Sequence, residues 1–549
     1  MVTASHNPVQ DNGLKMVDPS GGMLEQAWEA HAADVANAAV DDVSDALAAV
    51  AGPDLCGDAA CAGAVVVVGR DTRPSSGHLR DLVAAGVEAM GGTVTDVGVV
   101  TTPQLHYAVA ATNSTPRACE TARLGGMDAS MDGYFARLAA SYAAVLAAAG
   151  VDSAAAAAAQ GTTVIDAADG VGGPQAVRVA DSMKPGVAWE VRNAGGGDPA
   201  GLNEGCGAEF VQKGRCPPRG VDAAVDVCPG ARLCSLDGDA DRVVFHGFLP
   251  AGEGAGPRWE LVDGDKIAAL LAVTAGALLK RVGGDVASLS VGVVQTAYAN
   301  GAATRWVRAR GLEVACAKTG VKYVHHAAEA YDCGVYFEAN GHGTVVFSPA
   351  ALAAIDAAAD AAIVADAGVA TGSGAAESGA AAAAALAAGG DAGVAVEAAV
   401  GAMTPGAAAA CLQAFSVLIN QYVGDAVADA LACEAALRIG GAPFDRWVAM
   451  YSDLPSRQAK VRVADRLALT TTADESRLVE PEALQAAIDA AVAEVDAASG
   501  RAFVRPSGTE DVVRVYAEAA SVEQADRLAA SVARAVFDLA GGVGDAPAV

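Results

Sequence analysis

The sequence predicts an α/β fold built from three α/β domains in series and a smaller C-terminal α+β domain. The chain has 549 residues, which is more than one hydrophobic core usually organises. Apolar runs followed by Gly-containing turns recur at 64–69, 163–167 and 288–294, as in strands covered on both faces. Near the C-terminus, at 513–518, apolar and polar residues alternate, which indicates a strand with one solvated face.

The first α/β unit shows a complete strand–helix–strand pattern. The run at 64–69 predicts a strand, and 71–76 supplies the polar residues of a turn. Two glycines end the helix that follows, and 94–100 predicts the next strand. The helix is predicted from apolar residues at helical spacing, which are Leu79, Val83, Val87 and Met90.

A second amphipathic helix is predicted after the last strand. Ser521 and Gln524 form a capping-box pattern at its start, and Gly541 marks its end. The residues expected to face inward are Leu528, Val532, Val536 and Leu539.

The four predicted domains span 1–155, 156–270, 271–430 and 431–549. Within the third domain, 351–411 is so rich in Ala and Gly that no hydrophobic periodicity can be defended. We expect this stretch to be a surface insertion, and we assign no single secondary structure to it.

Charge and composition exclude several classes of partner. A formal net charge of −29 argues against nucleic acid and acidic membrane surfaces, because the field of the protein would repel them. No run of about 18 strongly hydrophobic residues could span a bilayer. Eleven cysteines lie scattered without a C-x-x-C pair, and no signal-peptide pattern follows Met1. We therefore expect a soluble cytoplasmic protein, and the sequence leaves its oligomeric state unknown.

The first motif with chemical content lies at 3–8, around Ser5. The step from Asn7 to Pro8 restricts the backbone to an extended turn, which would present the Ser5 hydroxyl from a fixed loop. The G-x-S-x-G elbow of acyl-transfer nucleophiles is absent. Taken alone, a serine in such a turn is more often structural than catalytic.

The second motif places three carboxylates at alternate positions, Asp237, Asp239 and Asp241, between two apolar segments. Such crowding is tolerated mainly when a cation neutralises it, and oxygen ligands favour a hard ion such as Mg²⁺. An EF-hand is excluded, because its sixth and twelfth positions would be Arg242 and Phe248 rather than Gly and Glu. An ordinary acidic turn remains the alternative.

Four further segments carry groups that suit a phosphorylated sugar. A loop at 505–510, with Arg514 on the strand after it, offers guanidinium groups and hydroxyls for a phosphate. Another, at 337–343, offers a carboxylate, an amide and an imidazole among small residues. Cations also lie at the turns 318–322 and 69–73, where open α/β sheets usually bind ligands. Each of these is also compatible with an ordinary solvated turn.

Together these segments resemble the α-D-phosphohexomutases, whose members carry a phosphoserine loop, a D-G-D-x-D-R metal loop, a sugar loop and a C-terminal phosphate loop in this order. The segments 2–8, 11–15, 101–107 and 295–301 are most similar to the acetylglucosamine branch of that family. The loop at 338–343 reads Glu-Ala-Asn-Gly-His-Gly, whereas glucose and mannose relatives usually carry Glu-Met-Ser-Gly-His.

The resemblance implies that the four domains surround a deep central cleft. It implies an enzyme that interconverts the 6- and 1-phosphates of N-acetylglucosamine, a step of UDP-N-acetylglucosamine biosynthesis. The implied cofactors are Mg²⁺ and a sugar 1,6-bisphosphate, which serves as activator and intermediate. The implied partner is a small-molecule sugar phosphate, and Ser5 is the implied phosphoserine.

The resemblance also assigns roles to individual residues. Catalysis falls to Ser5, His6 and Lys15, and metal binding to Ser5, Asp237, Asp239 and Asp241. The substrate-binding residues are Arg242, Lys318, Thr319, Gly320, Glu338, Asn340, His342, Arg505, Ser507, Gly508, Thr509 and Arg514. The general base stays open among Lys15, His342 and Lys318.

Two alternatives remain at this point. One is a mutase for glucose or mannose phosphate. The other is an inactive, truncated sugar-phosphate-binding protein, because the family's N-terminal strand and its phosphate-contact segment would precede Ser5 and are missing. On that reading Met1 is an internal methionine of a longer chain.

Overall fold

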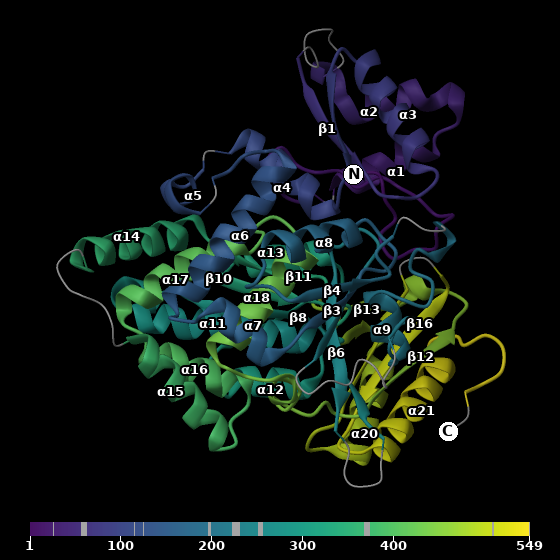
Figure 1. The fold of residues 1–549 in the computed structure, drawn as a ribbon. Coiled ribbons are helices and arrows are strands. Elements are labelled where there is room, and N and C mark those ends of the chain that lie inside the picture. The colour runs from purple at the N-terminus through teal and green to yellow at the C-terminus, as the bar shows by residue number, and fades with distance from the viewer. Residues whose placement is uncertain are drawn as a thin grey trace.

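The computed structural model shows three regions (Figure 1). An N-terminal unit, in purple, lies at the top; a C-terminal unit, in yellow, lies at the lower right; the rest of the chain forms a broad block between and beside them. The structure describes residues 1–25, 27–55, 63–114, 116–124, 126–195, 199–221, 231–250, 256–366, 374–507 and 510–547.

The N-terminal unit contains a parallel pair of strands, β1 (Val65–Arg70) and β2 (Thr93–Val99), connected by α3 (Ser76–Ala89). This confirms the predicted strand–helix–strand pattern. Residues 1–25 form no strand of this sheet, but Val2 bridges Arg70 and Met1 packs with Val67 and Val97. Two helices, α1 (Ala27–Asn37) and α2 (Val43–Leu55), follow this segment along the chain and precede β1.

Four helices lead from this unit into the central block. They are α4 (Thr102–Asn113), α5 (Ala118–Arg123), α6 (Met131–Ala148) and α7 (Ser153–Gln160). Helix α4 begins with a reciprocal capping box between Thr101 and Gln104, and Pro103 lies in its first turn. Helix α6 is buried along most of its length, so the N-terminal third of the chain already contributes to the central core.

The second sheet has five strands in the order β4-β3-β5-β6-β7. Strands β3, β4 and β5 run parallel, and β6 and β7 continue the sheet antiparallel. The predicted strand at 163–167 is therefore confirmed as β3. The strands and associated helices are β3 (Thr163–Asp166), β4 (Trp189–Arg192), β5 (Arg232–Leu236), β6 (Val243–Leu249), β7 (Arg258–Val262), α8 (Gly172–Ser182) and α9 (Ala208–Gly214).

The third sheet has four strands in the order β11-β10-β8-β9. Strands β8, β9 and β10 are parallel, and β11 pairs antiparallel with β10. The strand expected at 288–294 begins three residues later, because 284–288 forms a 3₁₀ turn. The elements are β8 (Val291–Thr296), β9 (Glu313–Ala317), β10 (Cys333–Phe337), β11 (Gly343–Phe347), α11 (Gly264–Val282), α12 (Gly301–Arg308) and α13 (Val321–Ala328).

The expectation of a surface insertion at 351–411 is wrong for much of that stretch. Where it is described, the chain is helical, and α16 and α17 pack against α11 and α6 in the core. Alanine gives no periodic signal, yet it favours helix and lets helices approach closely. The helices from here to the C-terminal unit are α14 (Pro349–Asp366), α15 (Gly374–Ala387), α16 (Ala392–Ala402), α17 (Pro405–Leu418), α18 (Ala426–Ile439) and α19 (Phe444–Val448).

The C-terminal unit contains an antiparallel sheet of order β12-β16-β15, covered by two helices. A short antiparallel pair, β13 and β14, accompanies it. The elements are β12 (Ser456–Arg462), β13 (Thr470–Thr471), β14 (Leu478–Glu480), β15 (Arg501–Pro506), β16 (Val512–Glu518), α20 (Glu482–Asp496) and α21 (Val522–Leu539).

The predictions for this unit are confirmed in most respects. The strand at 513–518 and the helix after it are present, and Ser521 Oγ accepts a hydrogen bond from Gln524 N. The expected solvated face of the strand is wrong, since Tyr516 and Glu518 are 3% and 1% exposed. The reciprocal half of the capping box is missing, since Gln524 Nε2 donates to Val495 O instead. Leu539, in the last turn of α21, is 45% exposed, so the expectation that it faces inward is wrong.

One large hydrophobic cluster extends from Tyr107 to Met450, and a second lies within the C-terminal unit, from Val461 to Val536. The second and third sheets and helices α6, α11 and α14–α18 thus share one core. In the described ranges no single helix is long and apolar enough to cross a membrane; α6 and α7 meet that test only as a pair bent by 90°. The four domain ranges given above stay a prediction.

The buried position of α17 can be tested by truncating one side chain. Leu412, which is 0% exposed, should cost about 2–5 kcal/mol of unfolding free energy when changed to Ala. Ile363→Ala in α14 is the control, because Ile363 is 51% exposed and should change stability by less than about 0.5 kcal/mol. Equal shifts in denaturant midpoint for the two variants would contradict the packing of α17.

Candidate active site

The Ser5 loop is held in place by buried hydrogen bonds rather than by secondary structure. Arg73, whose side chain is fully buried, donates from Nη2 to the carbonyls of Ser5 (3.0 Å) and Asn7 (2.9 Å). Asn203 Nδ2 donates to Ser5 O as well (2.9 Å), and Asp71 holds the Arg73 guanidinium (2.9 Å). The 69–73 segment therefore anchors the serine loop, and its second arginine is not a solvated charge.

Ser5 itself sits in a strained conformation, with φ 44° and 7% of its surface exposed. A left-handed serine costs free energy that the surrounding hydrogen bonds must offset. Gly238 lies against this loop, where a Cβ would come within 2.5 Å of Ser5 O. The serine loop and the loop after β5 thus approach each other as closely as backbone permits.

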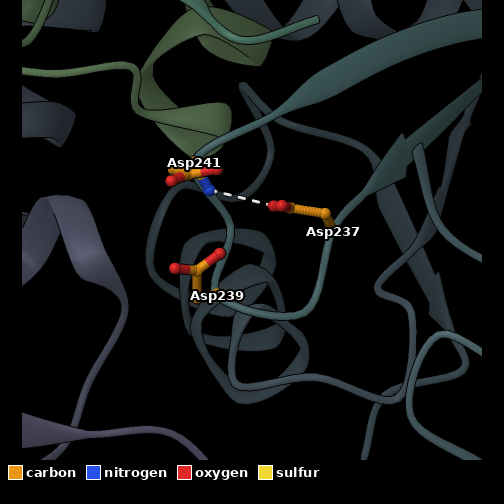
Figure 2. Close-up of side chains that lie close together, drawn as sticks. All are labelled: Asp237, Asp239 and Asp241. Carbon is orange, nitrogen blue, oxygen red and sulfur yellow. Dashed lines mark hydrogen bonds between the residues drawn. The ribbon is translucent and has the colours of Figure 1, made fainter. Parts of the chain in front are cut away.

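The loop after β5 carries Asp237, Asp239 and Asp241, whose side chains converge (Figure 2). One carboxylate oxygen from each lies within 4.8 Å of the others, and all three residues are at most 1% exposed. Asp237 Oδ1 accepts from the backbone N–H groups of Asp241 (3.1 Å) and Arg242 (3.2 Å), which fixes the loop.

Three oxygens of this cluster have no hydrogen-bond donor among the described residues: Asp237 Oδ2, Asp239 Oδ1 and Asp241 Oδ1. Burial, followed by the neighbouring carboxylates, raises the pKa of Asp237 well above its usual range. A buried, partnerless carboxylate oxygen is costly unless a cation or a proton satisfies it. The donor set, oxygen only and anionic, fits a hard divalent cation such as Mg²⁺.

Ser5 and Lys15 meet the cluster at the same atom. Asp239 Oδ2 accepts from Ser5 Oγ (3.2 Å), from Lys15 Nζ (2.7 Å) and from Thr102 Oγ1 (2.5 Å). Lys15 Nζ also donates to Asp241 Oδ2 (2.7 Å). Burial alone would lower the pKa of Lys15, but the two carboxylates outweigh it and raise the pKa above its usual range. Lys15 is therefore a fixed positive charge next to the serine hydroxyl.

His6 and Arg242 share a partner that the sequence did not reveal, Glu209 at the start of α9. Its Oε2 lies 3.1 Å from His6 Nε2 and 2.8 Å from Arg242 Nη1. Burial, then the charge of Arg242, lowers the pKa of His6 to about 4. Ser5 Oγ contacts Asp239 rather than His6, so this geometry links His6 to Arg242 and not directly to the nucleophile.

The sugar loop is the turn between β10 and β11, and it packs on the metal loop. His342 Nδ1 lies 3.5 Å from Asp241 Oδ1, and Val243 N donates to Gly341 O (3.1 Å). Gly341 has φ 85°, and a Cβ there would meet Val243 O at 1.9 Å, so only glycine permits this contact. Burial lowers the pKa of His342, which favours the neutral imidazole.

A cavity of about 450 Å³ opens beside the metal loop and the sugar loop. Its polar lining includes Lys15, Thr102, Asp241 and His342. Much of the apolar lining of the cavity comes from residues of the 14–24 segment, Leu14 among them. A concave site with few polar groups on an apolar wall is typical of small-molecule binding.

The other predicted residues form a second group. Glu338 Oε1 accepts from Gly320 N (3.2 Å), which ties the sugar loop to the loop after β9. In that loop Lys318 is exposed, with Nζ 5.0 Å from the Tyr323 ring centre, and the Thr319 hydroxyl has no partner among the described residues. Asn340 Oδ1 accepts from His342 N (3.0 Å), and this stabilises the turn that joins the two groups.

The phosphate loop begins where β15 ends. Arg505 and Arg514 are Cα partners on β15 and β16, and Ser507 N donates to Val512 O (2.9 Å). Gly508 and Thr509, also predicted to bind phosphate, lie outside the described residues. The described part therefore brings two arginines and Ser507 to one end of the sheet.

Glu475 connects this loop to the loop after β9, and nothing in its sequence surroundings indicated that role. Its Oε2 accepts from Thr319 N (3.1 Å) and lies 2.8 Å from Arg505 Nε. Glu475 is 6% exposed and has φ 58°, so the turn holds this side chain inward at a conformational cost. Two loops from different sheets are thus joined through one carboxylate oxygen.

Family models place the chain in the phosphohexomutase class. The model for phosphoglucomutase/phosphomannomutase α/β/α domain I matches residues 1–41 and 36–122, and that for the C-terminal domain matches 459–535. The intervening matches are to phosphoacetylglucosamine mutase AMG1 domain II, at 129–244, and domain III, at 263–371.

Individual relatives agree with the domain models. A phosphoacetylglucosamine mutase of Sus scrofa is 41% identical over 557 residues, which cover 100% of this chain and 88% of that relative. The Aspergillus fumigatus N-acetylphosphoglucosamine mutase, solved with GlcNAc-6P and magnesium, is 38% identical with a TM-score of 0.80. That alignment covers 98% of this chain and 88% of the fungal one. The chain belongs to the phosphoacetylglucosamine mutase family.

A crystal structure of the same fungal enzyme, in a variant form, contains glucose 1,6-bisphosphate. It is 37% identical to this chain, with a TM-score of 0.78, and the alignment covers 98% of this chain and 88% of the other.

The bridging role of Glu475 leads to a kinetic prediction for Glu475→Gln. The amide can still accept from Thr319 N, but it no longer carries the charge that orients Arg505. Hydrogen bonds to charged groups are worth about 1.5–3 kcal/mol, so we expect KM for the phosphorylated sugar to rise about tenfold or more while kcat changes less than about threefold.

Glu480→Gln is the matched control, because Glu480 is exposed on the neighbouring strand β14. Steady-state kinetics of both variants check the prediction. An unchanged KM in Glu475→Gln, or the same increase in the control, would refute the link between Glu475 and substrate binding.

Proposed function

We propose that this chain interconverts N-acetylglucosamine 6-phosphate and 1-phosphate, in a mechanism that passes through a phosphorylated Ser5 and a 1,6-bisphosphate. The observation that carries the proposal is the contact of Ser5 Oγ with Asp239, one of three buried carboxylates with partnerless oxygens. Membership of the family and the GlcNAc-6P complex of the fungal relative support the choice of sugar.

The metal site of this proposal consists of Asp237, Asp239, Asp241 and the phosphorylated Ser5. Bound there, Mg²⁺ would neutralise charge on the phosphoryl oxygens. The chain's own contribution is to hold three carboxylates in a dry, fixed loop, and to place Lys15 where its charge offsets theirs. Arg73 and Asn203 keep the serine loop rigid, so little reorganisation is needed when phosphate is transferred.

In the first transfer, the free hydroxyl of the bound sugar phosphate attacks the phosphorus of phosphoserine. A bond forms between the sugar oxygen and phosphorus, the bond from phosphorus to Ser5 Oγ breaks, and the hydroxyl proton passes to a base. Of the three candidates for that base, Lys15 is held protonated by Asp239 and Asp241, which raise its pKa, so His342 and Lys318 remain. The bisphosphate then reorients in the cleft. Its other phosphate is transferred to Ser5, and the product leaves.

Substrate binding falls to two loops in this proposal. Glu338 and Asn340 would bind sugar hydroxyls, with Lys318, Thr319 and Gly320 beside them. The phosphate that is not reacting would be held by Arg505, Ser507, Gly508, Thr509 and Arg514, far enough from Ser5 for the binding energy to orient the sugar. The product, a sugar 1-phosphate, would serve the synthesis of UDP-N-acetylglucosamine in the cytosol.

A second substrate deserves a direct comparison, because a variant of the fungal relative was crystallised with glucose 1,6-bisphosphate. The cleft of that enzyme therefore accepts a sugar without the acetamido group. Turnover of the 6-phosphates of N-acetylglucosamine, glucose and mannose, measured side by side with their bisphosphates as activators, ranks the three. The highest kcat/KM is expected for N-acetylglucosamine 6-phosphate.

Replacing the nucleophile tests the covalent step. With Mg²⁺ and a trace of the 1,6-bisphosphate, Ser5→Ala should lower turnover of N-acetylglucosamine 6-phosphate about 1,000-fold or more, because no phosphate can be stored on the enzyme. Ser182→Ala on the exposed end of α8 is the control. Full activity of Ser5→Ala, or no turnover by the unchanged chain, would overturn the proposal.

Metal binding can be tested without measuring activity. In the unchanged protein, Mg²⁺ at about 100 times its Kd should stabilise the fold by about 2.7 kcal/mol, seen as a higher Tm. Asp237→Asn keeps the acceptor for the two backbone N–H groups but loses one charged ligand. We expect this variant to fold at least as stably without Mg²⁺, since one buried charge is gone, and to need at least tenfold more Mg²⁺ for the same Tm increase. An identical Mg²⁺ response in both proteins would argue against the site.

A further inference from the structure

A second cavity, of about 460 Å³, lies between the third sheet and the C-terminal unit. Its walls come from β8, β9 and α12 on one side and from the 474–476 turn, the 498–501 segment and Glu518 on the other. None of the predicted catalytic, metal or substrate residues that the structure describes lines it. The turn at 472–476 separates the two sites: Asp474 and Ser476 line this cavity, whereas Glu475 reaches the loops of the active site.

Two arginines of α12 line the cavity one helical turn apart, Arg305 and Arg308. Neither has a carboxylate within ion-pair distance among the described residues, and both are exposed. Both lie in the last turn of α12, where the helix dipole favours cations.

A buried amide also belongs to the lining. Gln295 is 3% exposed, and its Oε1 accepts from Thr304 Oγ1 (2.8 Å). Its Nε2 is buried and has no partner among the described residues, and Gln295 lines the cavity. Leaving a buried amide donor unsatisfied costs about 1–3 kcal/mol, so an acceptor that reached Nε2 from the cavity would be stabilised.

The acidic groups of the lining are already satisfied. Glu518 accepts from Arg501 Nε (3.1 Å) and from Gly301 N (3.1 Å). Asp474 accepts from the hydroxyls of Thr472 (2.5 Å) and Ser476 (2.8 Å). The groups that remain without a partner are therefore donors, two of them cationic, and they select an anion with several acceptor oxygens.

We propose that this cavity is a second binding site for a phosphate monoester of a small hydroxylated molecule. Two guanidinium groups and an amide N–H match the oxygens of a phosphate. The volume exceeds that of a phosphate alone, and no aromatic ring lines the space for a nucleobase to stack on. Because its walls belong to two different units, the ligand would hold the C-terminal unit against the third sheet.

Equilibrium dialysis with labelled glucose 6-phosphate tests the proposal, and Ser5→Ala protein in Mg²⁺ prevents turnover. Two binding sites per chain are expected. Introducing Arg305→Gln and Arg308→Gln together should weaken binding at the proposed second site at least tenfold and leave binding at the active site unchanged. Introducing Arg505→Ala instead should weaken binding only at the active site. Replacing Arg527 and Arg534, two exposed arginines of α21, by Gln is the charge-matched control.

The same experiment can refute the second site without refuting the proposed function, and the reverse. A single site that is lost with Arg505→Ala and unaffected by the Arg305/Arg308 pair would overturn the second site and leave the proposed function intact. A single site lost only with the Arg305/Arg308 pair would support the second site and count against the proposed active site. Unchanged Tm of the double variant without ligand shows that it folds, and repeating the dialysis with N-acetylglucosamine 6-phosphate distinguishes the enzyme's own substrate from another phosphate ester.

Discussion

Three buried carboxylates, with one oxygen of each within 4.8 Å of the others, are the constraint on which the arrangement of the rest of the site depends. Their mutual repulsion and loss of hydration would be prohibitive unless positive charge and donors surround them. Lys15 approaches from the serine loop, Arg242 from the same turn, and backbone N–H groups fix Asp237. Each of the three carboxylates keeps one oxygen without a donor among the described residues, and this makes the cluster a candidate cation site.

The loops around the cluster are built on the same principle, because each is held by a buried charge that bonds to backbone or to another loop. Arg73 donates hydrogen bonds to carbonyls of the serine loop, and Glu209 contacts both His6 and Arg242. Glu475 joins the loop after β9 to Arg505. Irregular loops that must stay fixed without helix or strand bonds need such anchors, and a preorganised loop needs less rearrangement during phosphate transfer.

Outside the site, the chain packs into fewer hydrophobic cores than its length predicted. Helices α6, α11 and α14–α18 and two sheets share one hydrophobic cluster, so the second and third sheets are held in a fixed relation. The C-terminal unit has its own cluster. It meets the third sheet through polar contacts, such as those of Arg501 with Ala297 O and Ala299 O, and through packing of Tyr298 on Phe503 and Tyr516. A unit with a separate core is the part best able to move as substrate enters and leaves.

The sequence by itself determined the strands and helices whose signal lies within a few residues, such as β1, α3, β16 and α21. It also determined the chemical types at the site, because Ser5, the three aspartates and Arg505 lie in motifs that can be recognised locally. It could not place 351–411, since alanine carries no periodicity, nor the burial of Tyr516 and Glu518, which depends on the contact with residues 297–301.

Only the tertiary structure decided which residues meet. The contact of Ser5 with Asp239 joins positions 234 apart, and that of Thr319 with Glu475 joins positions 156 apart. No local pattern marked Glu209, Thr102 or Glu475, because a single polar residue in a turn looks the same whether it is solvated or buried against a distant loop. Local preference depends on neighbours along the chain, whereas pairing of buried charges depends on how the whole chain packs.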